Sequence, residues 1–252
     1  MKLKSTLLLS TLALSTAAFA QTKAPEPDYT LSFNAGVVSD YRYRGISQSR
    51  MDPAVQGGLD FAHKSGFYLG AWGSTIKWIK DSGIATTKGG VELDLYGGYK
   101  GELAKGLAYD VGVLRYEYVN NNLGAAPGYA NANTTEIYGA LTSGVLTAKY
   151  SRSLTNLFGN INSKGSQYLD LSATFDLGNG WSLTPHVGRQ LVNNSPALHY
   201  TDYSLTAAKD LGKGLSASLM LVDTNAKVAG YNWGSKGYVG KSGAVVGLKY
   251  SF

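Results

Sequence analysis

The last ten residues, Gly243 to Phe252, read GAVVGLKYSF and govern how the rest of the chain is interpreted. Apolar side chains occupy alternate positions of this stretch up to the final residue: Ala244, Val246, Leu248, Tyr250 and Phe252. This period of two predicts a β-strand with one apolar face. The last strand of an outer-membrane barrel must pair with the first to close the sheet, so an aromatic terminal strand favours such a barrel. An ordinary amphipathic terminal strand is the alternative.

The spacing of three residues in the same strand concerns how the barrel is assembled in the membrane. Gly247, Tyr250 and Phe252 resemble the C-terminal signal that the barrel-assembly machinery of Gram-negative bacteria recognises. The match is incomplete, since Val245 stands where that signal usually has a polar residue. We therefore expect this machinery and outer-membrane lipid as partners.

The composition fits the same class. The 252 residues include 18 Tyr and 32 Gly but no Cys, so a disulfide framework or a Cys-ligated metal site is excluded. Tyrosine combines an apolar ring with a polar hydroxyl, which suits a membrane interface. The formal charge is +6, of which Lys2 and Lys4 belong to a predicted leader. This mild, dispersed charge argues against nucleic acid as a partner.

The N-terminal residues predict export. Residues 1–20 have a basic start, an apolar core and the small-x-small pattern Ala18-Phe19-Ala20, which predicts a signal peptide cleaved near Ala20. The apolar run is too short for a membrane-spanning helix. Residues 21–28 form a flexible lead-in with two prolines, and residues 29–252 form the predicted barrel. The expected location is the bacterial outer membrane.

Period-two alternation recurs along residues 29–252 and predicts about twelve antiparallel strands, an all-β transmembrane β-barrel. Short turns near residues 63–66, 100–106, 142–144, 178–180 and 212–214 alternate with longer polar loops. Short periplasmic turns and long extracellular loops are typical of outer-membrane barrels. A soluble lipocalin-like barrel, with its apolar face inside, is the alternative.

Several segments resemble the TorF family of porin-like outer-membrane proteins. They are residues 38–48 (VSDYRYRGISQ), 53–58 (PAVQGG), 65–72 (SGFYLGAW) and 200–205 (YTDYSL). The resemblance spans nearly the whole chain after the leader, and its first segment is specific. It implies a barrel with a channel role, and it brings neither a substrate nor catalytic residues.

If the apolar faces contact lipid, the opposite faces line the lumen. The charged residues expected there are Asp40, Arg42 and Arg44 on the first strand, and Asp60, Glu92, Asp94, Asp110, Glu136, Lys149, Asp170, His186 and Lys249 on later ones. Arg42 and Arg44 would neighbour Lys249 across the closing seam and face an acidic wall, which would orient polar solutes. The alternative is a salt-bridge lattice that fills the barrel.

Arg42 and Arg44 are the pair of greatest interest. Two guanidinium groups two residues apart on one strand face could bind an anionic group through bidentate hydrogen bonds. Equally, they could stabilise the first loop by pairing with Asp40 or Asp60. Both interpretations remain open from the sequence.

The aromatic residues have two interpretations as well. Two membrane-interface girdles would account for Tyr29, Tyr99, Tyr109, Trp181, Tyr203, Tyr250 and Phe252 at the periplasmic side, and for Tyr43, Tyr118 and Tyr150 at the outer side. A sugar-stacking groove in the lumen, formed by Tyr68, Trp72, Tyr96 and Tyr138, is the functional alternative. The faces of strand 67–76 are ambiguous, because both carry aromatic residues.

These patterns predict a passive channel for small polar or ionic solutes, acting as a monomer or a homo-oligomer. An occluded barrel whose surface loops bind a partner is the second hypothesis, and a lipid-acting enzyme is the third. The three histidines, His63, His186 and His199, lack a local nucleophile motif, so we expect no catalytic residues. We also expect no metal site and no cofactor, because no His/Cys ligand spacing occurs.

Overall fold

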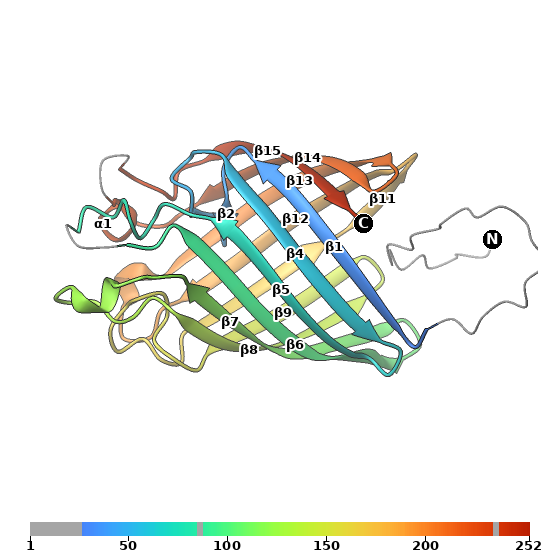
Figure 1. Cartoon of the computed structure of the whole chain (residues 1–252), viewed down its shortest axis with the longest axis horizontal. Helices are drawn as coiled ribbons and strands as arrows, with labels where there is room; N and C mark the ends of the chain where they lie inside the picture. Colours follow the sequence, from blue (N-terminus) through green and yellow to red (C-terminus); the bar gives the residue numbers. More distant parts are fainter. Residues whose placement is uncertain (1–26, 85–87, 234–236) are drawn as a thin grey trace, which may run out of the picture.

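The computed structural model describes residues 27–84, 88–233 and 237–252. The predicted signal peptide and most of the lead-in lie outside the described residues. The rest forms a closed antiparallel barrel of twelve strands, as predicted (Figure 1). The barrel strands are β1 (Tyr29–Val38), β4 (Ala54–His63), β5 (Phe67–Thr75), β6 (Val91–Ala104), β7 (Leu107–Tyr118), β8 (Thr134–Ser143), β9 (Leu146–Ser153), β10 (Gln167–Ala173) continued by β11 (Phe175–Gly178), β12 (Trp181–Leu191), β13 (Tyr200–Gly212), β14 (Leu215–Thr224) and β15 (Gly243–Ser251).

The terminal strand closes the barrel as its pattern predicted. β15 pairs with β1 from Val38↔Gly247 to Asn34↔Ser251, and with β14 on its other side. Two backbone hydrogen bonds of 2.8 and 3.0 Å continue the pairing between Phe33 and Phe252, whose rings stack 5.8 Å apart. The edge strands therefore satisfy each other's backbone groups, as a sheet in lipid requires.

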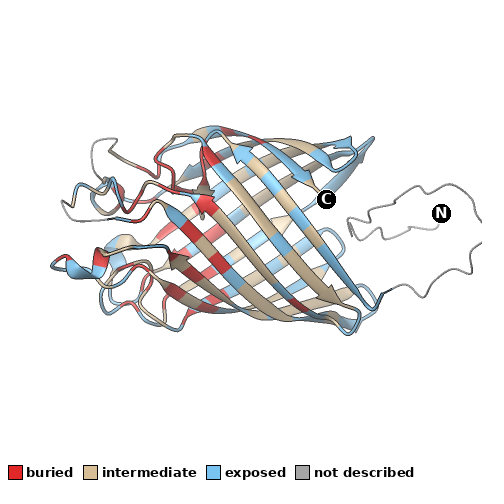
Figure 2. Ribbon diagram, in the orientation of Figure 1, coloured by how far each residue is buried: buried red, intermediate tan, exposed pale blue. Residues whose placement is uncertain are grey.

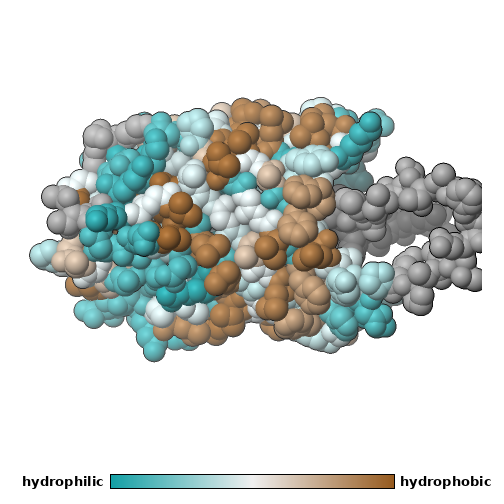
Figure 3. Space-filling model, viewed as in Figure 1, coloured by the Kyte–Doolittle hydropathy of each residue, from teal (hydrophilic) through white to brown (hydrophobic). Residues whose placement is uncertain are grey.

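The apolar faces of the strands point outward. In β1, Leu31 and Val37 are 52% and 48% exposed, while Ser32 and Gly36 between them are partly buried. On the face seen in Figure 3, apolar side chains form a band across the middle of the barrel, with polar surfaces toward its two ends. The soluble alternative is wrong, since it requires the opposite arrangement. No helix among the described residues is long and apolar enough to cross a membrane.

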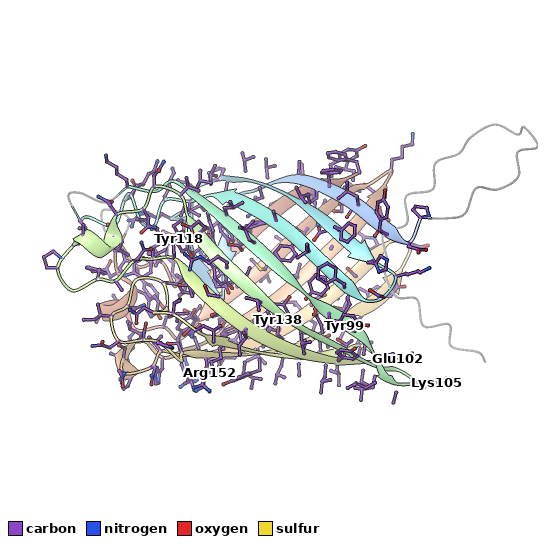
Figure 4. The ribbon with its side chains drawn as sticks, turned by 60° about the horizontal axis from the view of Figure 1, so that its bottom comes forward. Tyr99, Glu102, Lys105, Tyr118, Tyr138 and Arg152 are labelled. Atoms are coloured by element: carbon purple, nitrogen blue, oxygen red, sulfur yellow. The ribbon has the colours of Figure 1, made fainter. Side chains whose placement is uncertain are left out.

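Turns and loops lie at opposite ends of the barrel, with the long loops at the left of Figure 1. The turn between β6 and β7 is only Lys105-Gly106, because β6 extends to Ala104, beyond the predicted strand end. In Figure 4, Glu102 and Lys105 lie at the short-turn end and Tyr118 lies toward the loop end. The loops contain the short helix α1 (Val228–Tyr231) and the 3-10 turns η1 (Leu123–Ala125) and η2 (Pro196–Leu198).

The first loop folds back into the barrel. β1 ends at Val38, and the next segment forms a small hairpin of β2 (Arg42–Tyr43) and β3 (Ile46–Ser47). The expectation that Asp40, Arg42 and Arg44 extend the first strand is therefore wrong. The residues joining β2 to β3 are Arg44 and Gly45, with φ of 48° and 76°, as in a two-residue turn with positive φ at both positions. Figure 2 shows buried residues concentrated toward this end of the molecule.

The aromatic residues divide differently from the expected girdles. Tyr29, Tyr99, Trp181, Tyr250 and Phe252 are exposed on the outer face, as is Tyr150. Tyr203 is also exposed but lies near the loop end of β13, so it belongs to the outer girdle. Tyr118 is 2% exposed and Tyr43 lies in the inward hairpin, so neither is a girdle residue. Both pack inward because the loop end of the barrel is filled by a buried aromatic cluster.

Candidate functional site: the barrel interior

Tyrosine side chains cross glycines of neighbouring strands to reach carboxylates. In one row across three strands, Asp60 pairs with Gly70 and Gly70 with Tyr96. A Cβ on Gly70 would lie 2.3 Å from the Tyr96 ring, so the ring lies directly over the glycine. Its hydroxyl donates a hydrogen bond of 2.5 Å to Asp60 Oδ1. Glycine thus leaves the space in which an aromatic ring can lie along the sheet.

The pattern recurs at two other places. Tyr68 and Tyr138 approach each other across Gly98 and Gly112, their hydroxyls hydrogen-bond to each other, and Tyr68 also donates to Asp110 Oδ1 at 2.5 Å. On the opposite side of the barrel, Tyr168 crosses Gly188 and donates to Asp202 at 3.0 Å. Strand β5 therefore directs Tyr68 and Trp72 inward, which settles its ambiguous faces.

The inward segment, residues 39–53, is anchored on several sides. Asp40 accepts hydrogen bonds from Ser47 and Ser49, and Gln48 O accepts from the backbone N–H groups of Lys77 and Trp78. At the hairpin tip, a Cβ on Gly45 would lie 2.4 Å from Thr224 and 2.7 Å from Asp202. The hairpin therefore presses against β13 and β14 and narrows the interior.

Arg42 and Arg44 of the hairpin are both paired with carboxylates. Arg42 Nε donates to Asp40 Oδ2 at 2.5 Å, and its Nη1 donates to the carbonyls of Gly45 and Lys241. Arg44 reaches across to β8, where Nη2 and Nη1 lie 2.7 and 3.1 Å from the two oxygens of Glu136. Of the two sequence interpretations, pairing within the barrel describes this structure, although the partner of Arg44 is not Asp60.

The Arg44 guanidinium is enclosed by further groups. Nη1 donates to Gln190 Oε1 at 2.8 Å, and the Tyr168 ring centroid lies 4.2 Å from Cζ. The Arg44 and Glu136 side chains are only 6% and 3% exposed. Burial lowers the pKa of Arg44, but the Glu136 carboxylate and the nearby Tyr43 and Tyr116 together raise it further, so the pKa lies well above its usual value. Arg44 is thus a fixed positive charge.

The layer of the interior that contains Tyr43 and Arg44 has a cavity on each side. The outer cavity, about 410 Å³, is lined by loop aromatics and has Tyr43, Arg44 and Gln190 among its lining residues. An inner cavity of about 350 Å³ also contacts Tyr43 and Arg44, together with Lys149 and His186. Tyr43 and Arg44 therefore form the partition between an outer vestibule and the inner lumen, which we call the constriction.

The other residues predicted to line the lumen lie at different levels between the loop end and the short-turn end of the barrel. Glu92 and Asp94 lie near the loop end of β6, and Glu92 Oε2 and Asp94 Oδ1 are buried without a hydrogen-bond partner among the described residues. Lys149 Nζ lies 4.0 Å from the Tyr138 ring centroid. Lys249 pairs in register with Gly36 of β1 and lines a different cavity from Arg44. The expected basic wall across the seam is wrong, because both arginines leave the strand and turn into the barrel.

His186 is part of a polar cluster formed by β10, β12 and β13. Its Nε2 faces Asp170 Oδ2 at 3.2 Å and the Tyr168 hydroxyl at 3.4 Å, and Nδ1 lies 3.7 Å from Asp202. His63 contacts Ser65 in an exposed turn, and His199 contacts the Val192 carbonyl. Among the described residues, no group of three or more His, Asp or Glu is placed to hold a metal ion.

Sequence reasoning missed Asp202 and Gln190. Both share the inward parity of their strands, Asp202 with Ser204 and Gln190 with His186. Extending the predicted strands to Tyr200 and Leu191 would have found them. The glycine positions that admit the tyrosines had no such local signal, because their meaning depends on the residue in register on the next strand.

The fold is that of a porin-like outer-membrane β-barrel. The KdgM porin, solved in complex with disordered oligogalacturonate, superposes with a TM-score of 0.55 at 8% identity, covering 88% of this chain and 98% of that one. The NanC porin gives a TM-score of 0.53 at 12% identity, covering 88% and 99%. At these identities the similarity concerns the fold.

The chain belongs to the Gcw_chp family of bacterial proteins of unknown function, whose model matches residues 22–252. A search of curated proteins found no match. The solved structures show the fold alone and the matching family is not TorF, so the resemblance to TorF stays a prediction.

Proposed function

We propose that this protein is an outer-membrane channel through which small polar or ionic solutes diffuse, and that the inward hairpin sets its selectivity. The observation that carries the proposal is the pair of cavities meeting at Tyr43 and Arg44 inside a barrel with an apolar exterior. A fixed guanidinium and carboxylate at the narrowest layer give a solute both signs of charge to contact. We infer no catalytic role.

The test is single-channel conductance of the refolded protein in a planar bilayer under a salt gradient. Arg44→Ala removes the positive charge of the constriction and enlarges it, so conductance should rise and the reversal potential should shift toward cation preference. Glu136→Gln leaves Arg44 unpaired, so the reversal potential should shift toward anions. Lys64→Ala is the control, because Lys64 forms an exposed ion pair with Asp28 at the short-turn end.

Opposite shifts from the two constriction variants would support the channel. A folded barrel that passes no current, even as Arg44→Ala, would contradict it. One observation favours the second hypothesis, an occluded barrel with a binding role: Arg42 and Arg44 are buried in mutual pairs with Asp40 and Glu136. Persistent silence would therefore shift attention to the aromatic vestibule and its loops.

A further inference from the structure

A second inner cavity lies along the seam where the barrel closes. Its volume of about 470 Å³ falls within the range of about 300–1,000 Å³ typical of small-molecule sites. One side carries the aromatic rings of Trp72 and Tyr96. The other sides carry amide, hydroxyl and charged groups, from Asn34, Gln56, Asp60, Ser216, Ser218 and Lys249.

The two rings are held in place by their surroundings. Tyr96 lies over Gly70 and is fixed by its hydrogen bond to Asp60. Trp72 lies beside Gly58, where an added Cβ would be 3.1 Å from the indole Cδ1, and the Tyr41 ring packs against it edge-on at 5.4 Å. Both rings line the cavity, so they offer pre-positioned apolar platforms.

The polar groups facing these platforms are largely unused. The side chains of Asn34, Ser218 and Lys249 make no hydrogen bond or ion pair among the described residues, and Asp60 Oδ2 has no partner there. On β1, Ser32 pairs with Asp60 of β4, and Gly36 pairs with Lys249 of β15. Four residues of strand separate these levels by about 14 Å, so the two charges do not neutralise each other as an ion pair.

We propose that this cavity, defined by Trp72, Tyr96, Asp60, Asn34 and Lys249, is a binding site for neutral saccharides. A pyranose ring has apolar C–H faces that pack on aromatic rings and hydroxyl edges that both donate and accept hydrogen bonds. A carboxylate, an amide and an ammonium group supply the matching acceptors and donors. One negative and one positive charge in the lining favour a neutral solute. The site specifies the solute class of the proposed channel, and its physiological role rests on that function.

The experiment is calorimetric titration of the refolded barrel in detergent, which does not depend on conductance. The probes are cellobiose, the linear polyol sorbitol and the anionic disaccharide digalacturonate. Cellobiose should bind best, because sorbitol lacks a ring face and digalacturonate adds two negative charges. Trp72→Ala should weaken cellobiose binding about tenfold, which corresponds to about 1.4 kcal/mol, while Trp72→Phe should retain most of the affinity.

Tyr99→Ala is the matched control, because Tyr99 is exposed on the outer face of the same strand as Tyr96. If Trp72→Ala does not refold, Tyr96→Leu removes the second platform and should weaken binding similarly. Equal binding of sorbitol, tighter binding of digalacturonate, or unchanged affinity in the platform variants would overturn the proposal. A conducting barrel without cellobiose binding would refute this site alone, whereas cellobiose binding to a non-conducting barrel would refute the channel alone.

Discussion

At the scale of single residues, glycines determine where the interior tyrosines lie. Gly98 faces the Tyr68 hydroxyl, and an added Cβ would be 2.4 Å from that oxygen and 2.3 Å from the Val111 carbonyl. The backbone oxygen cannot move away as a flexible side chain could. The absence of a side chain at Gly98 is therefore a packing requirement of the interior rather than a source of flexibility.

We expect Gly98→Ala to destabilise the barrel by about 1–3 kcal/mol through overpacking. Gly139→Ala is the control, since its Cβ would meet only Val111 Cγ1, at 3.8 Å. Urea unfolding of both variants in lipid vesicles gives the difference. Equal urea midpoints for the two variants would show that Tyr68 and the sheet accommodate the added methyl group without loss of stability.

The outward parity can be tested at Leu171, which is 43% exposed in β10. Leu171→Arg places a charge against lipid and should cost about 2–4 kcal/mol of stability near mid-membrane. Ser172→Arg, one residue along and facing the interior, should cost less because its charge can remain hydrated. Urea unfolding in lipid vesicles measures the stability of both variants. Similar losses of stability at the two positions would contradict the assigned faces.

At the scale of elements, the β2–β3 hairpin is the feature that distinguishes this barrel from an open tube. Backbone contacts to Lys77 and Trp78 and the hydrogen bonds of Asp40 hold it on the loop side, and the Arg44–Glu136 pair ties it to β8. Its two-residue turn positions Arg44 toward β8. The strands enclose the interior, and this hairpin lies between its outer and inner cavities.

Replacing residues 42–47 with a flexible Gly-Ser linker should leave the barrel folded and raise conductance several-fold, because the partition between the two cavities is removed. Replacing residues 193–195 of another loop in the same way is the control, because these residues line neither of the two cavities. Conductance in planar bilayers and heat-modifiable migration on gels measure opening and folding together. An unchanged current from the hairpin variant would mean that another segment limits passage.

At the scale of the whole molecule, closure of the sheet depends on the last residue as well as the last strand. Phe252 forms two backbone hydrogen bonds with Phe33 and stacks on its ring. It is also the last residue of the Gly247, Tyr250, Phe252 spacing. Recognition of this spacing by the assembly machinery stays a prediction. The residue therefore has a structural role that is separable from a role in assembly.

Deleting Phe252 should lower the stability of the refolded barrel by about 1–3 kcal/mol, from two hydrogen bonds at about 0.5–1.5 kcal/mol each. In cells the loss should be larger, measured as the amount of folded barrel in the outer membrane. Phe252→Tyr keeps the aromatic end and should assemble normally. Normal cellular assembly of the deletion variant would remove the signal interpretation.

The sequence alone was enough to predict the number of strands, the closing role of the last one and most of the outward-facing side chains, apart from those of β5 and from Tyr43 and Tyr118. These properties follow from alternation along a single strand, which requires no knowledge of other strands. The inward positions of Asp60, Asp110 and Lys149 follow from it in the same way. The ends of strands were less well predicted, because β1 stops at Val38 while the polar pattern continues.

The contacts of those inward side chains could be known only from the folded barrel. Arg44 and Glu136 are 92 residues apart in sequence, and Tyr96 meets Asp60 only because Gly70 lies between them in register. Such contacts depend on the register of several strands and on the path of a loop through the lumen. Alternation fixes the face of each residue, but it carries no information about which residue stands opposite.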